Sequence, residues 1–480
     1  MLNKGRSYSI GSTLGSVLLI SVSAAASAGD WRFDKGINAG AVYTDNVNLV
    51  SSGKESDLSG VLTPHFSLHG KGGRANVDIT GALEFNSQSG STDSFNPRLQ
   101  ADANAELIER VAFIDLNATA TQNVIDTLAV SGTDNLSNRG NKTTTYSYRI
   151  SPYLKSRFGG VADTELRYTY NGINHSEGSV GDTSSEAVNL SVNSGTDFSR
   201  ISWGVNASHR TLDDDQGEVS ELNALDLSLG YRINRRWQIN GSVGSESNDF
   251  ASTQSSNDGS RWDIGALWTP NPRTSLDFGI GERFFGSTKR LSFSHKSRRS
   301  VLTATYTHDL TDVTTLLSEQ VVFQVVDVFG NPVLDPVTGD PQLLVFDLPT
   351  LNNSTFVDER LALSYTLQGR RSTLTLNGNM SDQTYQDSSR EVSSVGLGAT
   401  FSRDLSGRLS GDVGLNWNQW DESGTGSRET ESWRLSAGIN QQLGQKTNLR
   451  FNYSYTDYDS NQSGQSYDEN KLSLTLSHTL

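Results

Sequence analysis

Apolar and polar side chains alternate along this chain from Phe33 to Leu480, in segments of about eight to twelve residues separated by polar or glycine-containing breaks. One such segment, residues 201–208, places Ile201, Trp203, Val205 and Ala207 on one face and Ser202, Gly204, Asn206 and Ser208 on the other. Because successive side chains of a β-strand point to opposite faces, each segment has an apolar and a polar side. The pattern predicts an all-β protein, and a soluble β-sandwich with its apolar faces inward would show the same alternation.

The breaks distinguish a membrane barrel from a sandwich, because short and long breaks alternate. Short breaks such as 70–73 are followed by long polar connections such as 123–141, 310–356 and 420–430, and the break around Gly286 is an exception that is short where a long one is due. Outer-membrane barrels combine short periplasmic turns with longer outer loops. Counting between breaks gives about 22 strands, within a range of roughly 18–24, and an even number leaves both termini in the periplasm. The sequence therefore predicts a single antiparallel transmembrane β-barrel.

Composition agrees with a wall that faces lipid on one side and water on the other. Only 34% of the residues are hydrophobic, which is low for a chain of 480 residues that had to bury a soluble core. The absence of cysteine excludes a disulfide scaffold, a cysteine-ligated zinc site and a thiol enzyme. Backbone hydrogen bonds close a barrel without any such staple.

The N-terminus reads as an export signal. Residues 1–28 begin with Lys4 and Arg6, continue through a mostly apolar stretch and end in Ala-Ser-Ala, which predicts a signal peptide cleaved after Ala28. A membrane anchor is the alternative, but the apolar stretch is too short to span the bilayer. Residues 29–480 then form one domain, the barrel, in the outer membrane of a Gram-negative bacterium. Only residues 29–32 precede the first strand, so we expect no N-terminal plug domain.

The two ends of the predicted barrel differ in charge. Short turns are rich in arginine and lysine, whereas long loops carry acidic runs such as 213–215. We expect contacts with outer-membrane lipid and lipopolysaccharide, where acidic loops either share divalent cations with the lipopolysaccharide or are simply solvated. The last segment alternates up to Leu480 and resembles the signal read by the barrel assembly machinery, although an aromatic residue usually stands at that end.

If the apolar faces meet lipid, the polar faces line a lumen. The charged candidates for this inner face are Asp78, Glu84, Asp102, Asp115, Glu165, Arg167, Asp226, Arg232, Asp263, Asp277, Arg283, Arg360 and Asp412. Mixed charges of this kind either line a hydrophilic path or pair with one another as interior packing. Residues 310–356 contain a β-prone run followed by several turn-forming Asn-Pro and Asp-Pro pairs. This long loop is predicted to form an outer hairpin or a segment folded into the lumen.

No constellation of catalytic, cofactor-binding or metal-binding residues emerges. The seven histidines are scattered, and His65 and His69 would lie about 13 Å apart on a strand, too far for one metal ion. No nucleophile-elbow motif, EF-hand loop, phosphate-binding loop or basic patch is present. We therefore expect no enzyme activity, no cofactor, no metal and no nucleic-acid partner.

Three stretches together resemble the outer-membrane proteins associated with the PEP-CTERM/exosortase system. They begin at AVYTDNVNL, PRTSLDFGIGERFF and FVDERLALSYTLQGRR, and the YTDNVNL segment, with the Asp57 and Pro64 that follow it, is the most specific part. The resemblance implies association with exopolysaccharide and its export proteins, and it offers no catalytic residues. We expect a porin-like conduit or scaffold in exopolysaccharide export or envelope assembly. A structural or adhesive barrel with a packed lumen is the alternative, and a barrel-wall hydrolase is a weaker one.

Overall fold

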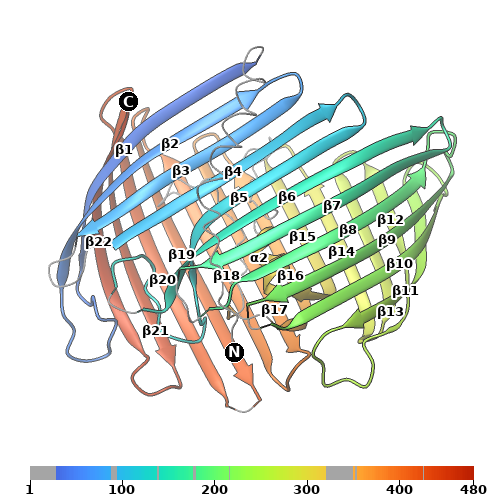
Figure 1. Ribbon diagram of the computed structural model, residues 1–480. Coiled ribbons are helices and arrows are strands. Elements are labelled where there is room, and N and C mark those ends of the chain that lie inside the picture. The colour runs from blue at the N-terminus through green and yellow to red at the C-terminus, as the bar shows by residue number, and fades with distance from the viewer. Residues whose placement is uncertain are drawn as a thin grey trace, which may run out of the picture.

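The computed structural model is a closed barrel of 22 antiparallel strands, which confirms the fold class and the strand number (Figure 1). The structure describes residues 29–87, 94–137, 140–176, 180–215, 217–319, 350–351, 354–424 and 426–480. The predicted signal peptide and most of the long loop, residues 320–349, lie outside this part of the chain. The strands are β1 (Asp30–Thr44), β2 (Asp57–Lys71), β3 (Ala75–Ser87), β4 (Ser94–Ile108), β5 (Ala112–Val124), β6 (Lys142–Phe158), β7 (Ala162–His175), β8 (Thr183–Ser194), β9 (Ile201–Asp214), β10 (Val219–Arg232), β11 (Trp237–Asp249), β12 (Gly259–Asn271), β13 (Thr274–Arg283), β14 (Gly286–Lys296), β15 (Ser300–Asp312), β16 (Thr355–Gln368), β17 (Ser372–Tyr385), β18 (Glu391–Asp404), β19 (Leu409–Ser423), β20 (Arg428–Gln442), β21 (Thr447–Ser460) and β22 (Tyr467–Thr479).

The barrel closes where the first strand meets the last. Each strand pairs with its neighbours in the chain, and β1 also pairs with β22 from Gly36 opposite Thr479 to Thr44 opposite Lys471. In Figure 1 the blue β1 accordingly lies beside the red β22. Closure leaves no open strand edge, which in an isolated sheet would expose unpaired backbone groups.

The outer surface is apolar because alternate residues of every strand face away from the lumen. On β10, Leu225, Leu227 and Leu229 are 49%, 53% and 66% exposed, while Asp226 and Ser228 point to the other side. Large exposed apolar side chains repeat in this way around the barrel. A surface of this kind is costly in water and is typical of a wall in contact with lipid.

Short turns and both ends of the barrel domain lie at one end of the barrel, the turn end, and longer connections lie at the other, the loop end. The paired strands extend further towards the loop end than the polarity of the sequence indicates. The predicted connection 420–430 shrinks to residues 424–427 between β19 and β20. Above the lipid both faces of a strand contact water or loops, so alternation disappears from the sequence while backbone pairing continues.

The buried apolar residues gather at the loop end rather than within the wall. One cluster, which we call the mouth cluster, consists of Leu128, Ile173, Val180, Val313, Leu316, Leu317, Leu351, Phe356, Tyr385, Val392 and Trp420. Three of its members belong to the short helix α2 (Val313–Glu319), which follows β15 and contacts β6 and β8. Among the described residues, no helix has the length and apolar character needed to cross a membrane.

Candidate functional site

A ladder of ion pairs covers the inner face of the wall from β10 to β15. Arg261 binds Asp226 (Nε–Oδ1 2.6 Å), and its Nη1 lies 3.7 Å from Oε2 of Glu246 on β11. The same Glu246 oxygen lies 2.5 Å from Nη2 of Arg283, which also pairs with Asp309. Beside this chain, Arg290 joins Asp263 (3.0 Å) and Asp277. Charge-assisted bonds of this kind fix each side chain against the wall.

The ladder is not electrically neutral. Five carboxylates share three guanidinium groups, because Asp226, Glu246, Asp263, Asp277 and Asp309 face only Arg261, Arg283 and Arg290. Its most deeply placed member is Glu246, whose side chain is 1% exposed. A cavity of about 380 Å³ lies against this part of the wall and is bordered by Asp226, Asp263 and Arg283. The ladder therefore combines structural pairing with a local excess of negative charge.

A second network lies on β5 to β7 at the same face. Arg167 binds Asp115 (2.8 Å) and Glu165 (2.9 Å), and its guanidinium carbon stands 3.8 Å from the ring centre of Tyr153. Tyr153 in turn stacks on Phe113, with ring centres 5.2 Å apart. The sequence predicted the three charged residues, and the structure brings them together.

The remaining predicted residues lie elsewhere in the barrel. The structure places their contacts as follows: Asp78 with His69 (2.9 Å), Glu84 with Arg98 (2.7 Å), Asp102 with Asn117 (2.6 Å), Arg360 with Asp358 (2.7 Å), Asp412 with Arg450 (3.0 Å), and the backbone N–H of Arg232 with the carbonyl oxygen of Arg200 (2.8 Å). These contacts are separate pairs rather than one centre. Glu246, Arg261 and Arg290 were not among the predicted inner-face residues, although they alternate with outward apolar residues in the same way as the predicted ones.

Residues 125–137 of the β5–β6 connection form a strap that runs along the loop-end mouth to a distant part of the wall. Asp126 pairs with Arg428 of β20 (2.6 Å), seven strands away around the ring. Asp134 pairs with Lys471 of β22 (2.8 Å), five strands away. In Figure 1 the strap is the teal trace seen against β19 and β20. The sequence analysis read this connection only as a long polar loop.

Backbone and side-chain hydrogen bonds hold the strap between these two ion pairs. The N–H of Val130 donates to Oε1 of Gln465 (3.2 Å), and the hydroxyl of Tyr467 donates to the carbonyl oxygen of Ser131 (3.2 Å). Val130 also packs with Leu49, Tyr458 and Tyr467 in a second buried apolar cluster. Each of these contacts with the wall involves at least one side chain, and no strand pairing of the barrel depends on the strap.

The pKa of Asp134, in the strap, is lowered by the groups around it. Burial by itself would raise the pKa of this carboxyl, but the charge of Lys471 and the hydrogen bond from Lys471 lower it below the ordinary value of 3.8. A hydrogen bond from the backbone N–H of Leu136 acts in the same direction. Asp134 is therefore ionised at neutral pH and attaches the strap as a charged group.

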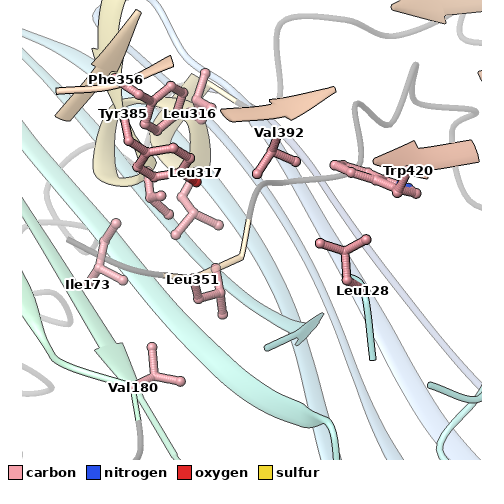
Figure 2. Packing of buried hydrophobic residues seen from close by; sticks show 11 residues of the cluster. Leu128, Ile173, Val180, Leu316, Leu317, Leu351, Phe356, Tyr385, Val392 and Trp420 are labelled. Carbon is pink, nitrogen blue, oxygen red and sulfur yellow. The ribbon is translucent and has the colours of Figure 1, made fainter. Parts of the chain in front are cut away.

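The mouth cluster joins the strap to α2 and to the opposite wall. Figure 2 shows Trp420 near Leu128 of the strap, Leu351 near Leu317, and Leu316 and Leu317 of α2 beside Phe356 and Tyr385. Leu128 is 1% exposed and Phe356 is fully buried. The cluster thus brings apolar side chains from both sides of the barrel together at the loop end.

Helix α2 is held in this position by its first turn. Asp312 accepts a hydrogen bond from the backbone N–H of Thr315 (2.9 Å), as an N-cap residue does, and Arg210 of β9 binds the same carboxylate at 2.7 and 3.1 Å. The hydroxyls of Thr314 and Thr183 lie 3.0 Å apart. The described start of the long loop 310–356 therefore turns into the mouth, towards β8 and β9.

No group of three or more histidine, aspartate or glutamate side chains within the described ranges is arranged to hold a metal ion. His65 and His69, four residues apart, both lie on β2, and His69 binds Asp78. The geometry instead provides a wide wall with paired charges and a mouth narrowed by loops.

Comparison with known proteins gives similarity in fold only. No family model and no curated protein matches the chain. Among solved structures, it is similar to the siderophore receptor PirA from Acinetobacter baumannii, with a TM-score of 0.50 and 9% identity over 93% of this chain and 80% of that one. It is also similar to the FrpB iron transporter from Neisseria meningitidis, with a TM-score of 0.50 and 8% identity over 93% of this chain and 82% of that one.

The closed 22-strand barrel, its apolar outer surface and these two similarities define the class of protein. The chain is an outer-membrane β-barrel of the Gram-negative type. The two similar proteins are a receptor and a transporter rather than enzymes. Both sequence identities are below 10%, so the similarity concerns the fold, and what those two proteins bind or transport is said of them alone.

Proposed function

We propose that this barrel is a conduit for a hydrophilic polymer, with exopolysaccharide export as its setting, and that the strap and the mouth cluster form its gate. The observation that carries the proposal is the strap, residues 125–137. It lies across part of the mouth, yet all 22 strand pairings are complete without it. A segment attached through two ion pairs, several hydrogen bonds and buried side chains in two apolar clusters, but through no strand pairing, can leave the mouth while the wall stays closed.

The resemblance to proteins of the PEP-CTERM/exosortase system supports the export setting. Under this proposal the partners are exopolysaccharide and its export proteins, together with lipopolysaccharide around the barrel and the assembly machinery that inserts it. Iron carriers have no comparable support, because the similarity to the siderophore receptor and the iron transporter lies in the fold.

Planar-bilayer recording tests the conduit. The key variant replaces residues 127–136 by a short Gly-Ser linker, and its control shortens the β8–β9 connection at the turn end, residues 195–200, in the same way. We expect the strap variant to conduct more current than the wild type and the control. Absence of current from every variant would overturn the conduit, and normal polysaccharide secretion after chromosomal deletion of the gene would overturn the export setting.

A structural or adhesive barrel is the second candidate, and the ion-pair ladder on β10 to β15 favours it. Paired charges on an inner wall stabilise that wall whether or not anything passes. This candidate predicts that the strap variant stays non-conducting, so the same recording separates the two functions.

A further inference from the structure

Four asparagines gather on the inner face of β17 and β19. Asn377 and Asn379 alternate with the outward Leu376 and Met380 on β17, and Asn416 and Asn418 alternate with the outward Leu415 on β19. Strand register places Asn377 and Asn416 on the two sides of Gly398, and Asn379 and Asn418 on the two sides of Gly396. We call these four residues the amide patch.

The two glycines of β18 allow the amides to converge. A Cβ atom at Gly396 would stand 2.5 Å from Oδ1 of Asn379 and 2.8 Å from Oδ1 of Asn418. At Gly398 it would stand 2.6 Å from Nδ2 of Asn377 and 2.8 Å from Oδ1 of Asn416. Since real Cβ atoms do not approach so closely, the amides occupy the room that a side chain on β18 would need.

These amides are free to bind a ligand. None of the four makes a side-chain hydrogen bond with any other described residue, and all four are only partly buried. Gln383 lies on the same inner face of β17, four residues after Asn379. It is 2% exposed, and its Oε1 also has no partner within the described chain. The four amides are open to the solvent of the lumen, so a ligand can bind them by replacing water and without breaking a contact within the described chain.

The surroundings define the chemistry of that partner. None of the twelve inner-face positions in three successive rows of β16 to β19 is charged: Thr366, Thr375, Thr400, Gly414, Ser364, Asn377, Gly398, Asn416, Ala362, Asn379, Gly396 and Asn418. On β20 the row of Asn379 and Asn418 continues with Ser432, and the row of Asn377 and Asn416 continues with Arg434. The ladder of β10 to β15, in contrast, carries eight charged groups. An amide offers donors and an acceptor together, which matches the hydroxyl groups of a sugar. Arg434 adjoins Asn416 at one edge of the patch, so the four amides rather than this cation define most of the surface that a ligand would contact.

We propose that the amide patch is a binding site for a neutral, hydroxyl-rich sugar chain on the lumen wall. The inference deepens the proposed conduit by assigning its cargo a chemical class and a place on the wall, and it rests on that function only for its biological role. Each sugar unit can exchange hydrogen bonds with amides of β17 and β19 across the glycines of β18. Neutral amide–hydroxyl bonds are individually weak, so the chain is held loosely at the patch and can move on.

Calorimetric titration tests the site in a detergent without a sugar headgroup. The probes are isomaltohexaose, which is neutral, and hexagalacturonate, which is anionic. The wild type and the strap-shortened variant are both titrated, so that a closed mouth does not hide binding. We expect isomaltohexaose to bind at least one of these proteins and to bind it more tightly than hexagalacturonate does.

Variants separate the patch from the rest of the wall. Asn379→Ala with Asn418→Ala is expected to weaken binding about tenfold or more, since at least two neutral hydrogen bonds are lost. Gly396→Ala keeps every amide but displaces two of them, and is expected to weaken binding as well. The matched control is Asn189→Ala on the inner face of β8, which lies across the barrel.

The outcomes distinguish the site from the conduit. Absence of isomaltohexaose binding, equal binding of hexagalacturonate, or an equal loss in Asn189→Ala would each overturn the amide site. Retained migration of folded barrels on unheated gels shows that a variant has not simply unfolded. Sugar binding without current in any bilayer would overturn the conduit and leave the amide patch as a binding site. Current without sugar binding would overturn the binding site and leave the conduit.

Discussion

Leu128 is the residue whose truncation most directly tests the strap as a movable gate. Its side chain is 1% exposed in the mouth cluster, where Trp420 lies near it in Figure 2. Replacing a fully buried leucine by alanine costs about 2–5 kcal/mol, from the lost transfer of apolar surface and the cavity left behind. Leu128 belongs to no strand, so we expect this cost to fall on the docking of the strap rather than on the barrel.

The magnitude translates into an open population. Each 1.4 kcal/mol changes an equilibrium constant tenfold, so even a loss of about 2 kcal/mol raises the undocked fraction of the strap roughly 30-fold. The chain contains no cysteine, which allows a single reporter thiol to be introduced. Val130→Cys is suitable, because Val130 is 5% exposed and lies in the strap itself.

The assay is the rate at which a water-soluble maleimide labels this cysteine in the folded barrel. When opening and closing are fast, the rate follows the open fraction, so Leu128→Ala should accelerate labelling about 30-fold or more. Leu229→Ala, a truncation on the lipid-facing side of β10, is the control and should leave the rate unchanged. An unchanged labelling rate in Leu128→Ala, combined with unfolding of the barrel at lower urea concentration, would refute the reasoning, because Leu128 would then support the wall.

Three further outcomes follow from the contacts described above. Arg283→Ala should lower the free energy of unfolding by about 3 kcal/mol in urea titrations, because it leaves the buried Glu246 with only a distant guanidinium; a loss no larger than that of Arg232→Ala would contradict this. Because the pKa of Asp134 is lowered in the folded chain, its contribution to strap docking is present above pH 3.8 and is lost as the pH falls further; the rate at which pepsin cuts the strap, divided by its rate on a free peptide of residues 125–137 at the same pH, should therefore be higher at pH 2 than at pH 4, and Asp134→Asn should reduce that difference. Leu227→Arg places a charge on the lipid side of β10 and should destabilise the barrel in vesicles by about 2–4 kcal/mol, whereas a neutral effect would place this residue outside the bilayer.

The strands of the wall were predictable from the sequence because the direction of each side chain depends on its position within a short segment. A period of two residues separates lipid-facing from lumen-facing side chains, and the breaks between segments count the strands. The same period identified Asp226 and Arg283 as inner-face candidates without showing that Glu246 and Asp309 would be their partners. Pairing across the wall depends on the register between strands, which alternation by itself does not determine.

The mouth was not predictable because its contacts connect residues far apart in the chain. Asp126 and Arg428 are 302 residues apart, and a polar loop has the same composition whether it extends outward or lies across the lumen. Leu128, Val130 and Leu136 were the available signal, since three apolar residues in a polar loop are buried if the loop turns inward. The long loop 310–356 received more attention because its apolar run is longer, and only its two ends lie in the described chain.

The amide patch left a clearer mark in the sequence. Leu376-Asn377-Gly378-Asn379 and Leu415-Asn416-Trp417-Asn418 share the pattern Leu-Asn-x-Asn, which puts two amides on the polar face of each strand. The pattern shows nothing about proximity until the register places both pairs beside the glycines of β18. Asparagine is also uncommon in strands, so four of them at adjoining positions suggest a role other than the stability of the sheet.

The two sides of the lumen wall differ in what they leave available. On β10 to β15 the guanidinium groups are already bound to carboxylates, and breaking those pairs to hold a ligand would expose buried charge such as that of Glu246. On β16 to β19 the amides have no partner to give up, so binding there costs only the displacement of solvent. A hydrophilic chain that entered this lumen would therefore be held on the amide side, with the excess carboxylates of the neighbouring ladder discouraging anionic competitors. This division of the wall argues that the ladder maintains the shape of the barrel and that selection of the cargo takes place on the neighbouring strands β16 to β19.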